Sequence, residues 1–183
     1  MGKLFRSQNP EVQPSLTLVV DRALPAHTAP LPEKLATITR PRSSEIVRTR
    51  EFLLDMDHGG SGGHAGNGGH TFMDMSINGA AMDMKVINER VKMGVWERWR
   101  IRSNQGAHPF HVHGCSFLID RMEGAAAPLD QQGWKDTVVL DDDDWSEIVV
   151  RFDYPATEQY PYMYHCHILE HEDRGMMGQF TVS

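Results

Sequence analysis

The densest group of potential metal ligands in this chain lies near its C-terminal end. Three imidazoles, one thiol and one thioether follow each other closely there, in the order His165, Cys166, His167, His171 and Met176. Two histidines and a cysteine in a trigonal plane, with a weak axial methionine, make up a blue-copper electron-transfer site. This stretch therefore indicates a copper centre.

A second group of imidazoles precedes the first. His108, His111 and His113 lie within the sequence His-Pro-Phe-His-Val-His. Side chains alternate between the two faces of a β-strand. If this sequence is extended, His111 and His113 share one face and His108 lies on the other, although the intervening proline makes the position of His108 less certain.

The same parity applies to the His-Cys-His sequence. In a strand over residues 164–167, His165 and His167 point one way and Cys166 points the other. The two strands therefore predict two metal environments, with Cys166 and His108 in one. The other takes four histidines, which are His111, His113, His165 and His167. Since both of its neighbours in the chain belong to the second environment, Cys166 offers a short bonded route for an electron.

Residues after the thiol must return to it for the first environment to close. The sequence Ile168–Asp173 resembles one helical turn, and Gly175 permits a sharp reversal. We expect His171 to join His108 and the thiol in one plane, with Met176 axial. Soft thiolate and thioether ligands select copper. Zinc, which also binds histidine and cysteine, is the alternative, and the methionine argues against it.

Size, charge and cysteine content limit the possibilities further. The 183 residues are enough for one domain with a core, and a net charge of -7 argues against a nucleic-acid partner. Cys115 and Cys166 are the two cysteines. Because an oxidised Cys166 has no thiolate to offer, we expect both to be unpaired, with Cys115 as a small buried apolar residue.

Nothing in the sequence indicates a membrane partner. Residues 1–10 lack the apolar core of a secretory signal, and no apolar run approaches the ~18 residues of a membrane span. Taken as a complete gene product, the chain is expected to be cytoplasmic.

Strand patterns dominate the chain, and turn signals such as Asn78-Gly79 separate most of them. The expected strands are Ser15–Val20, Glu45–Met56, Thr71–Ile77, Val95–Ser103, Phe110–Met122, Thr137–Leu140, Ser146–Asp153, Tyr162–Cys166 and Gly178–Val182. Many short strands and few helical patterns predict an all-β fold, a Greek-key β-sandwich or barrel with a short helical turn after His-Cys-His.

Composition divides the chain into two parts. Residues 1–42 contain a leading strand and a proline-rich linker, and residues 43–183 form the expected copper-binding domain. Within that domain residues 57–70 are a Gly/His-rich loop that cannot hold a packed core. Residues 141–144, four aspartates, are expected to be a solvated turn, with a cation site as the alternative.

The histidine motifs resemble those of the multicopper oxidases, specifically their C-terminal cupredoxin domain in the laccase-like and copper-efflux (cuprous) oxidase branch. The likeness extends to Ile77–Gly79, Gly133–Val138 and Met176–Val182. It covers roughly Ser43–Ser183, and the proline-rich Leu24–Pro41 resembles the linker between the family's second and third domains.

The resemblance implies two kinds of copper site. A complete type 1 site would use His108, Cys166 and His171, with Met176 axial. The type 2 and type 3 coppers would share four histidines: His111 for type 2, and His113, His165 and His167 for type 3.

The resemblance also implies a reaction. Cys166 would pass single electrons from a substrate to the type 2 and type 3 cluster, where oxygen becomes water. Glu172 matches an acidic position that helps deliver protons in the family, and the alternative is an ordinary surface carboxylate.

Methionines bear on the substrate of such an enzyme. Several lie near the Gly/His-rich loop, namely Met56, Met73, Met75, Met82, Met84 and Met93. Thioethers suit Cu(I), as in copper homeostasis, but methionine also fills gaps in cores. Residues 104–107 lack the acid and methionine that cuprous oxidases can carry before His108. Phenolic and Cu(I) substrates both remain open.

The chain supplies about half of the cluster ligands. Full-length members have an N-terminal domain with further His-x-His pairs, whereas the remaining histidines here are isolated: His27, His58, His64 and His70. We expect N-terminal cupredoxin domains, on the same or another chain, as partners, and no oxygen reduction without them. The alternatives are a stand-alone cupredoxin for electron transfer or copper binding, and copper storage by the loop. The resemblance implies a periplasmic location.

Overall fold

The computed structural model describes residues 19, 29–30, 32–33, 35–57, 74–141 and 144–183. The chain divides into two units, residues 1–37 and 38–183, and all the described strands belong to the second. Several expectations fall outside the described residues. They are the strand Ser15–Val20 apart from Val19, the loop from His58 to His70, Met73, the isolated His27, and Asp142 and Asp143.

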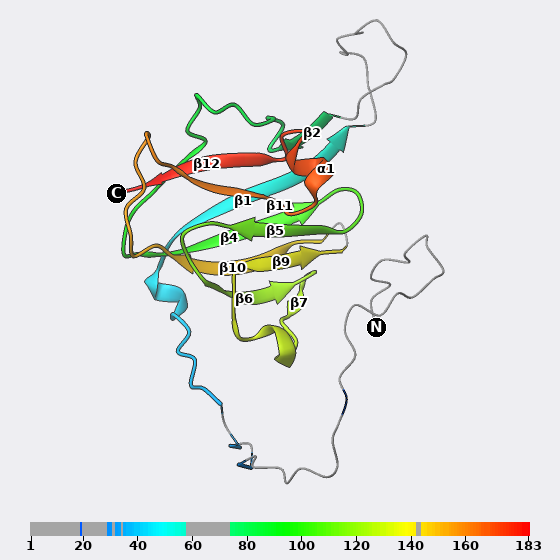
Figure 1. The fold of residues 1–183 in the computed structure, drawn as a ribbon. Coiled ribbons are helices and arrows are strands. Elements are labelled where there is room, and N and C mark those ends of the chain that lie inside the picture. Colours follow the sequence, from blue (N-terminus) through cyan, green and yellow to red (C-terminus); the bar gives the residue numbers. More distant parts are fainter. Residues whose placement is uncertain (1–18, 20–28, 31, 34, 58–73, 142–143) are drawn as a thin grey trace, which may run out of the picture. The chain divides into compact units, whose positions relative to one another are not determined.

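The first sheet has seven strands in the order β2-β1-β4-β10-β6-β7, with β8 beside β6 (Figure 1). Their bounds are β1 Ile46–Asp57, β2 Asp74–Ile77, β4 Trp96–Ser103, β6 Phe117–Met122, β7 Ala125–Ala126, β8 Trp134–Lys135 and β10 Ser146–Arg151. Burial alternates residue by residue along β4. This alternation is expected of a strand with one face on the core.

The second sheet has five strands in the order β3-β12-β11-β5-β9. Their bounds are β3 Glu89–Val91, β5 His108–Val112, β9 Thr137–Leu140, β11 Tyr162–Cys166 and β12 Met177–Val182. The strands β5 and β11 carry the two histidine motifs and pair antiparallel, with His165 opposite His111 and Cys166 opposite Phe110. The register therefore brings both motifs together.

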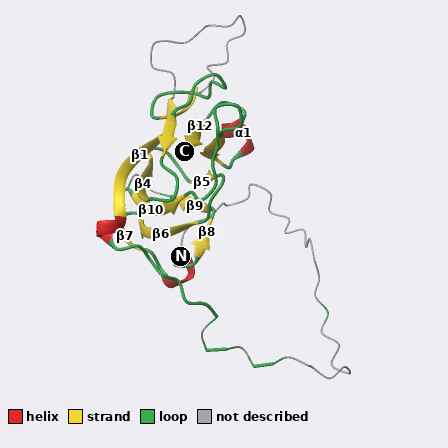
Figure 2. Ribbon diagram, turned by 90° about the vertical axis from the view of Figure 1, so that its left-hand side faces the viewer, coloured by secondary structure: helices red, strands yellow, loops and turns green. Residues whose placement is uncertain are grey.

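In the described part of the chain three short helices lie outside the sheets, and Figure 2 shows helices in red at the periphery of the strands. They are η1 Ser43–Glu45, η2 Leu129–Gln131 and α1 Leu169–Glu172. The predicted helical turn after His-Cys-His is α1.

Aromatic side chains join the two sheets. Phe52 of β1 lies 4.8 Å, between ring centroids, from Trp99 of β4 and also 4.8 Å from Tyr164 of β11. Phe52 and Trp99 are fully buried. Buried aromatic residues contribute strongly to a core, and here they hold β11 two residues before Cys166. The predicted all-β, cupredoxin-like sandwich is confirmed.

The predicted single strand Phe110–Met122 is wrong. It is two strands in different sheets, β5 and β6, joined by a turn in which Gly114 has φ +77°. A Cβ at Gly114 would clash with the ring of Tyr162, so the chain passes this ring only because the residue is glycine. Residues 110–122 contain one glycine and no proline or asparagine, so little in the sequence marks the turn. The short strands β3, β7 and β8 also lack a readable pattern.

Candidate metal centre

Three side chains form a nearly equilateral triangle of ligand atoms at one end of the sandwich. Cys166 Sγ lies 3.4 Å from Nδ1 of His108 and 3.4 Å from Nδ1 of His171, and the two Nδ1 atoms are 3.3 Å apart. Cys166 is fully buried and His108 is 1% exposed. The sequence predicted this grouping, His108 and Cys166 from strand parity and His171 from the helical turn that follows, and the structure brings the three residues together.

The size of the triangle suits a metal ion. From these edges, the point equidistant from the three atoms lies about 1.9 Å from each, close to the ~2.0–2.3 Å at which imidazole and thiolate bind zinc. A trigonal His-Cys-His set with a buried thioether in the same core cluster fits copper better than zinc. The residues present are therefore compatible with copper.

The chain itself selects the nitrogen of His108 that faces the thiol. Nε2 of His108 lies 2.7 Å from the main-chain oxygen of Gln105. Because a carbonyl oxygen only accepts hydrogen bonds, Nε2 carries the proton and Nδ1 keeps a free lone pair. Nothing in the sequence points to this contact, since a main-chain oxygen leaves no mark on residue type.

Main-chain hydrogen bonds place Met176 beside the same group. The N–H of Met176 donates to His171 O at 2.9 Å, and the N–H of Cys166 donates to Met176 O at 3.1 Å. Met176 is fully buried in the core. Gly175, with φ +89°, makes the reversal that the sequence predicted.

Burial sets the protonation of these groups. It lowers the pKa of His108 and of His171, so both imidazoles favour the neutral form that binds metals. Burial also raises the pKa of Cys166 to about 11, although a main-chain hydrogen bond from Ile168 opposes the shift. The free chain therefore holds a thiol at neutral pH, and a metal must displace its proton.

A second group of imidazoles lies on the other side of β5 and β11. Ligand atoms of His111, His113 and His165 all lie within 4.8 Å of one another, and Nε2 of His113 is 3.2 Å from Nε2 of His165. Burial, followed by the neighbouring imidazoles, lowers the pKa of His113. Three imidazoles facing one point are a potential metal site.

His167 lies at the edge of this second group. Its ring centroid is 5.6 Å from that of His111 and 5.3 Å from that of His165, and its side chain is 56% exposed. Glu172 of α1 contacts both strand neighbours of the thiol, with Oε1 3.1 Å from Nδ1 of His165 and 3.4 Å from Nδ1 of His167. The buried Oε1 has no hydrogen-bond partner, and Nδ1 of His165 lies 3.1 Å from Cys166 O, so these are close electrostatic contacts and not hydrogen bonds.

The orientation of His111 depends on residues that we did not single out from the sequence. Its Nδ1 lies 2.8 Å from Asp136 O and 3.1 Å from Thr137 Oγ1. Both acceptors belong to the sequence Gly133–Val138, which is marked by its family likeness. The sequence also offers a local signal, because polar Asp136 and Thr137 stand just before and at the start of the edge strand β9, where Thr137 lies opposite His111.

The methionines differ in environment. Met75 is 2% exposed and packs in the core, whereas Met84 is 81% exposed. The packing interpretation therefore holds for Met75. Both cysteines are unpaired as predicted, but Cys115 is only partly buried.

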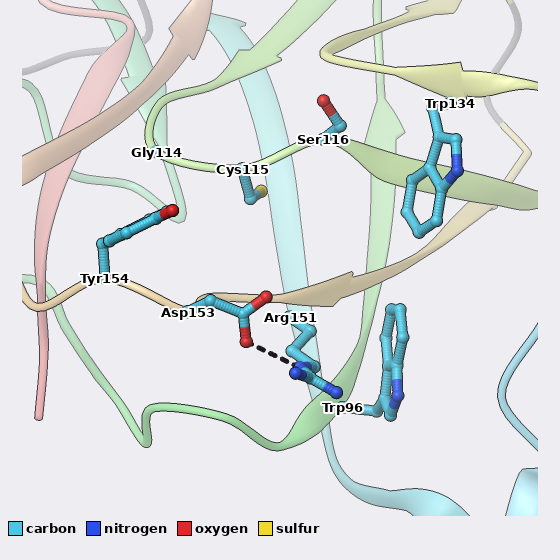
Figure 3. Close-up of a pocket in the computed structure, with 8 residues that line it drawn as sticks. All are labelled: Trp96, Gly114, Cys115, Ser116, Trp134, Arg151, Asp153 and Tyr154. Carbon is cyan, nitrogen blue, oxygen red and sulfur yellow. Dashed lines mark hydrogen bonds and ion pairs between the residues drawn. The ribbon is translucent and has the colours of Figure 1, made fainter.

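A pocket with different chemistry is lined by residues of the first sheet and of adjoining loops, and by neither histidine group. Figure 3 shows Trp96 and Trp134 along one side of it. Nε of Arg151 donates a hydrogen bond of 2.7 Å to Oδ1 of Asp153. The two indoles are 6.5 Å apart between centroids and nearly parallel. Trp134 is 49% exposed. The pocket begins at Gly114, directly after His113, and contains Cys115.

Two packed, mainly antiparallel sheets, with His108, Cys166 and His171 grouped at one end, define a cupredoxin-like domain. Comparison with known proteins gives the family. Residues 51–183 match the family described as multicopper oxidase (Cu-oxidase_2). The chain belongs to the multicopper oxidase family.

Individual relatives carry different names. The cell division protein FtsP of Yersinia pestis is 35% identical over 166 residues, which are 91% of this chain and 31% of that protein. The multicopper oxidase mco of Staphylococcus haemolyticus is 39% identical over 115 residues, 60% of this chain and 25% of that protein. The structure of a laccase-like multicopper oxidase CueO from an Ochrobactrum species superposes with a TM-score of 0.76. It is 35% identical and matches 90% of this chain and 37% of its own.

The chain thus spans about a third of the length of the relatives it matches. No helix among the described residues is both long and apolar enough to cross a membrane.

Proposed function

We propose that this chain is the type 1 copper-bearing C-terminal domain of a multicopper oxidase. The observation that carries the proposal is the triangle of Cys166 Sγ and the Nδ1 atoms of His108 and His171, with edges of 3.3–3.4 Å. Met176, buried beside it, is the proposed axial ligand. Copper bound there would take single electrons from a reduced substrate and feed a cluster that converts oxygen to water.

In such an enzyme Cys166 and Glu172 would have different roles. Cys166 lies between His165 and His167 in the chain, so the thiol of one group is bonded through main chain to two imidazoles of the other. Glu172 Oε1 contacts both of these imidazoles at 3.1 and 3.4 Å. We propose that it orients them, and that it also helps deliver protons, as the acidic residue at this position does in the family.

The second group is proposed to be half of the cluster. Four histidines belong to it, and no other histidine in the described residues lies near: His111, His113, His165 and His167. Binding three coppers requires more imidazoles than these. We therefore propose that N-terminal cupredoxin domains, on the same chain or another, complete it, in line with the chain's one-third share of its relatives.

Phenols and Cu(I) are the proposed substrate classes. The laccase-like oxidase of the Ochrobactrum species is described as active towards lignin model compounds and lignosulfonate, which supports phenols. The exposed Met84 supports Cu(I) as the other class, because a thioether binds soft ions. Family resemblance supports a periplasmic location.

The name FtsP indicates a role in cell division for several relatives. The copper proposal depends on the ligand geometry of this chain and not on those names. If a longer protein that contains this domain acts in cell division, the copper-loading experiment still tests the type 1 site.

Copper loading tests the proposal directly. The chain, reduced and then given one equivalent of Cu(II) anaerobically, should become intensely blue. Oxygen uptake with a phenol or with Cu(I) should be absent for the chain alone and appear when the N-terminal domains of a relative are added. A colourless copper complex would refute the type 1 assignment, and oxygen uptake by the chain alone would refute the half-cluster.

A stand-alone cupredoxin is the second candidate, favoured by one observation. All the proposed type 1 ligands lie within this chain and are largely buried. Such a protein would be blue and would exchange electrons with a redox partner, but added N-terminal domains would not give it oxygen uptake.

A further inference from the structure

Of the proposed copper ligands, Met176 would form the weakest bond to the metal. The axial thioether of a blue-copper site is weak and long, so the protein must set its distance. Gly175, directly before it, has φ +89° and no side chain to pack. A constant axial distance therefore requires contacts that fix the Gly175–Met176 peptide.

Two of these contacts come from the site itself. Met176 N–H donates to His171 O at 2.9 Å, and Met176 O accepts from Cys166 N–H at 3.1 Å. A third comes from a segment far away in sequence: Gly175 O accepts a hydrogen bond from Met82 N–H at 2.9 Å. The turn is therefore supported from outside by residues between β2 and β3.

We call residues 81–88 the strap. Figure 1 shows it in green, following β2 and running beside β12. It lies close against the turn, since a Cβ added to Gly175 would be 3.0 Å from Met82 N and 3.2 Å from Ala81 Cβ. A displacement of the strap would therefore also displace Gly175.

Gln179 anchors the other end of the strap. Its side-chain Nε2 donates to Met84 O and to Val86 O, both at 2.9 Å. Its main chain exchanges two further bonds with Asn88, at 2.9 Å each. Gln179 is 4% exposed, whereas the side chains of Met84 and Val86 are 81% and 46% exposed. Polar contacts to Gln179, rather than burial of these apolar side chains, hold the strap at this point.

We propose that Gln179 is a positioning residue for the copper site. By anchoring the strap it fixes Gly175, and through Gly175 it sets the distance of the Met176 sulfur from the metal. The inference rests on the proposed function, because it concerns the axial ligand of a type 1 copper. It assigns the strap a role that depends on its main chain and not on its methionines.

Substitution of Gln179 by leucine tests the proposal. Q179L keeps a buried side chain of similar size but cannot bond Met84 O or Val86 O. The loosened thioether becomes a weaker donor, so Cu(I) is favoured. We expect the blue colour to remain, and the equilibrium constant for reduction against a mediator of fixed potential to rise about threefold or more. Lys85→Ala, which changes an exposed strap side chain, is the matched control and should leave this constant unchanged.

A double-mutant cycle identifies the ligand through which Gln179 acts. Met176→Leu should raise the constant by itself, and Q179L should add nothing in that background. An unchanged constant in folded, blue Q179L overturns the proposal, and so does an equal effect of Q179L with and without Met176.

A second substitution guards against a Q179L chain that fails to fold. Asn88→Ala removes the Oδ1 acceptor at the end of the strap and should shift the constant in the same direction by a smaller factor. If Q179L does not fold and N88A leaves the equilibrium constant for reduction unchanged, the proposed role of the strap is refuted. Failure of the proposed function is distinct, because it would leave the unsubstituted chain without a blue colour.

Discussion

The two histidine groups differ in what the chain supplies around them. Cys166, His108 and Met176 are at most 1% exposed and lie in the core, and His171 completes their group from α1. The second group lies on the opposite face of the same two strands, and the side chain of His167 is 56% exposed. One group is closed by its own domain, whereas the other is open to another surface.

This difference follows from strand parity. Inward side chains of β5 and β11 meet residues of the same domain, because the two sheets pack face to face. Outward side chains meet only the edge of their own domain, as His111 does at Asp136 and Thr137, and otherwise face away from its core. A single pair of strands therefore builds one site inside the domain and one at its surface, with a peptide bond between them.

The largest expected effect separates the two groups. Cys166→Ser removes the thiolate, so the copper-loaded chain should lose its intense blue colour completely, as measured by visible absorption. His113→Ala changes the open group alone and should keep the full colour. Blue C166S protein would place the type 1 site elsewhere, and colourless, folded H113A protein would mean that the two groups are not independent.

Much of the closed group could be predicted from sequence, because parity is a local property. The spacing His108-x-x-His111 puts these residues on opposite faces of β5, and Cys166 between two histidines obeys the same rule. The register of β11 against β5, with Cys166 opposite Phe110, depends on the whole sheet and is not written in either motif.

Most of the contacts that support the two histidine groups could not be predicted from the sequence. Gln105 O, Asp136 O and the strap act through main-chain atoms, which any residue type offers. The break between β5 and β6 was missed because Gly114 alone marks it in residues 110–122, which contain no proline or asparagine. Tertiary packing against Tyr162, and not the local pattern, makes that glycine necessary.

Glu172 offers the next largest effect and concerns the open group. Glu172→Gln removes the charge that contacts His165 and His167 at 3.1 and 3.4 Å. Loss of a carboxylate that orients metal-binding imidazoles costs about 10–100-fold in metal affinity. In the C166S background, where the closed group has lost its thiolate, calorimetric titration with Zn(II) should show a loss of this size.

The neighbouring Glu170, which is exposed on the same helix, provides the control. Glu170→Gln should bind Zn(II) as C166S itself does. Equal affinities in the Glu172 and Glu170 variants would remove Glu172 from the orientation of the open group.

Both groups contribute to a dependence of stability on pH. Burial lowers the pKa of His108, His113 and His171. The unfolded chain, with histidine pKa values near 6.5, therefore binds protons at a higher pH than the folded chain does. Stability should be fully present above that pKa and fall as the pH drops through it, so the urea midpoint of the metal-free chain should decrease from pH 7.5 to pH 5.5.

Removal of one of the three imidazoles refines this result. His113→Ala should reduce the slope of the midpoint against pH without abolishing it, because His108 and His171 remain. A midpoint that stays constant over the interval, or rises, would contradict the burial of neutral imidazoles in both groups.

Thr137→Val should have the smallest effect, and it tests how the open group is oriented. Thr137 Oγ1 lies 3.1 Å from Nδ1 of His111, but Asp136 O lies closer, at 2.8 Å. Because the main-chain acceptor remains, losing the hydroxyl should weaken Zn(II) binding in the C166S background by about threefold, the equivalent of less than one neutral hydrogen bond. The blue colour of the otherwise unchanged chain should be unaffected, since His111 faces away from Cys166. A loss as large as that of Glu172→Gln would mean that the hydroxyl, and not the Asp136 carbonyl, is the main partner of His111. A loss of blue colour would show that the open group is coupled to the closed one through β9 and β5.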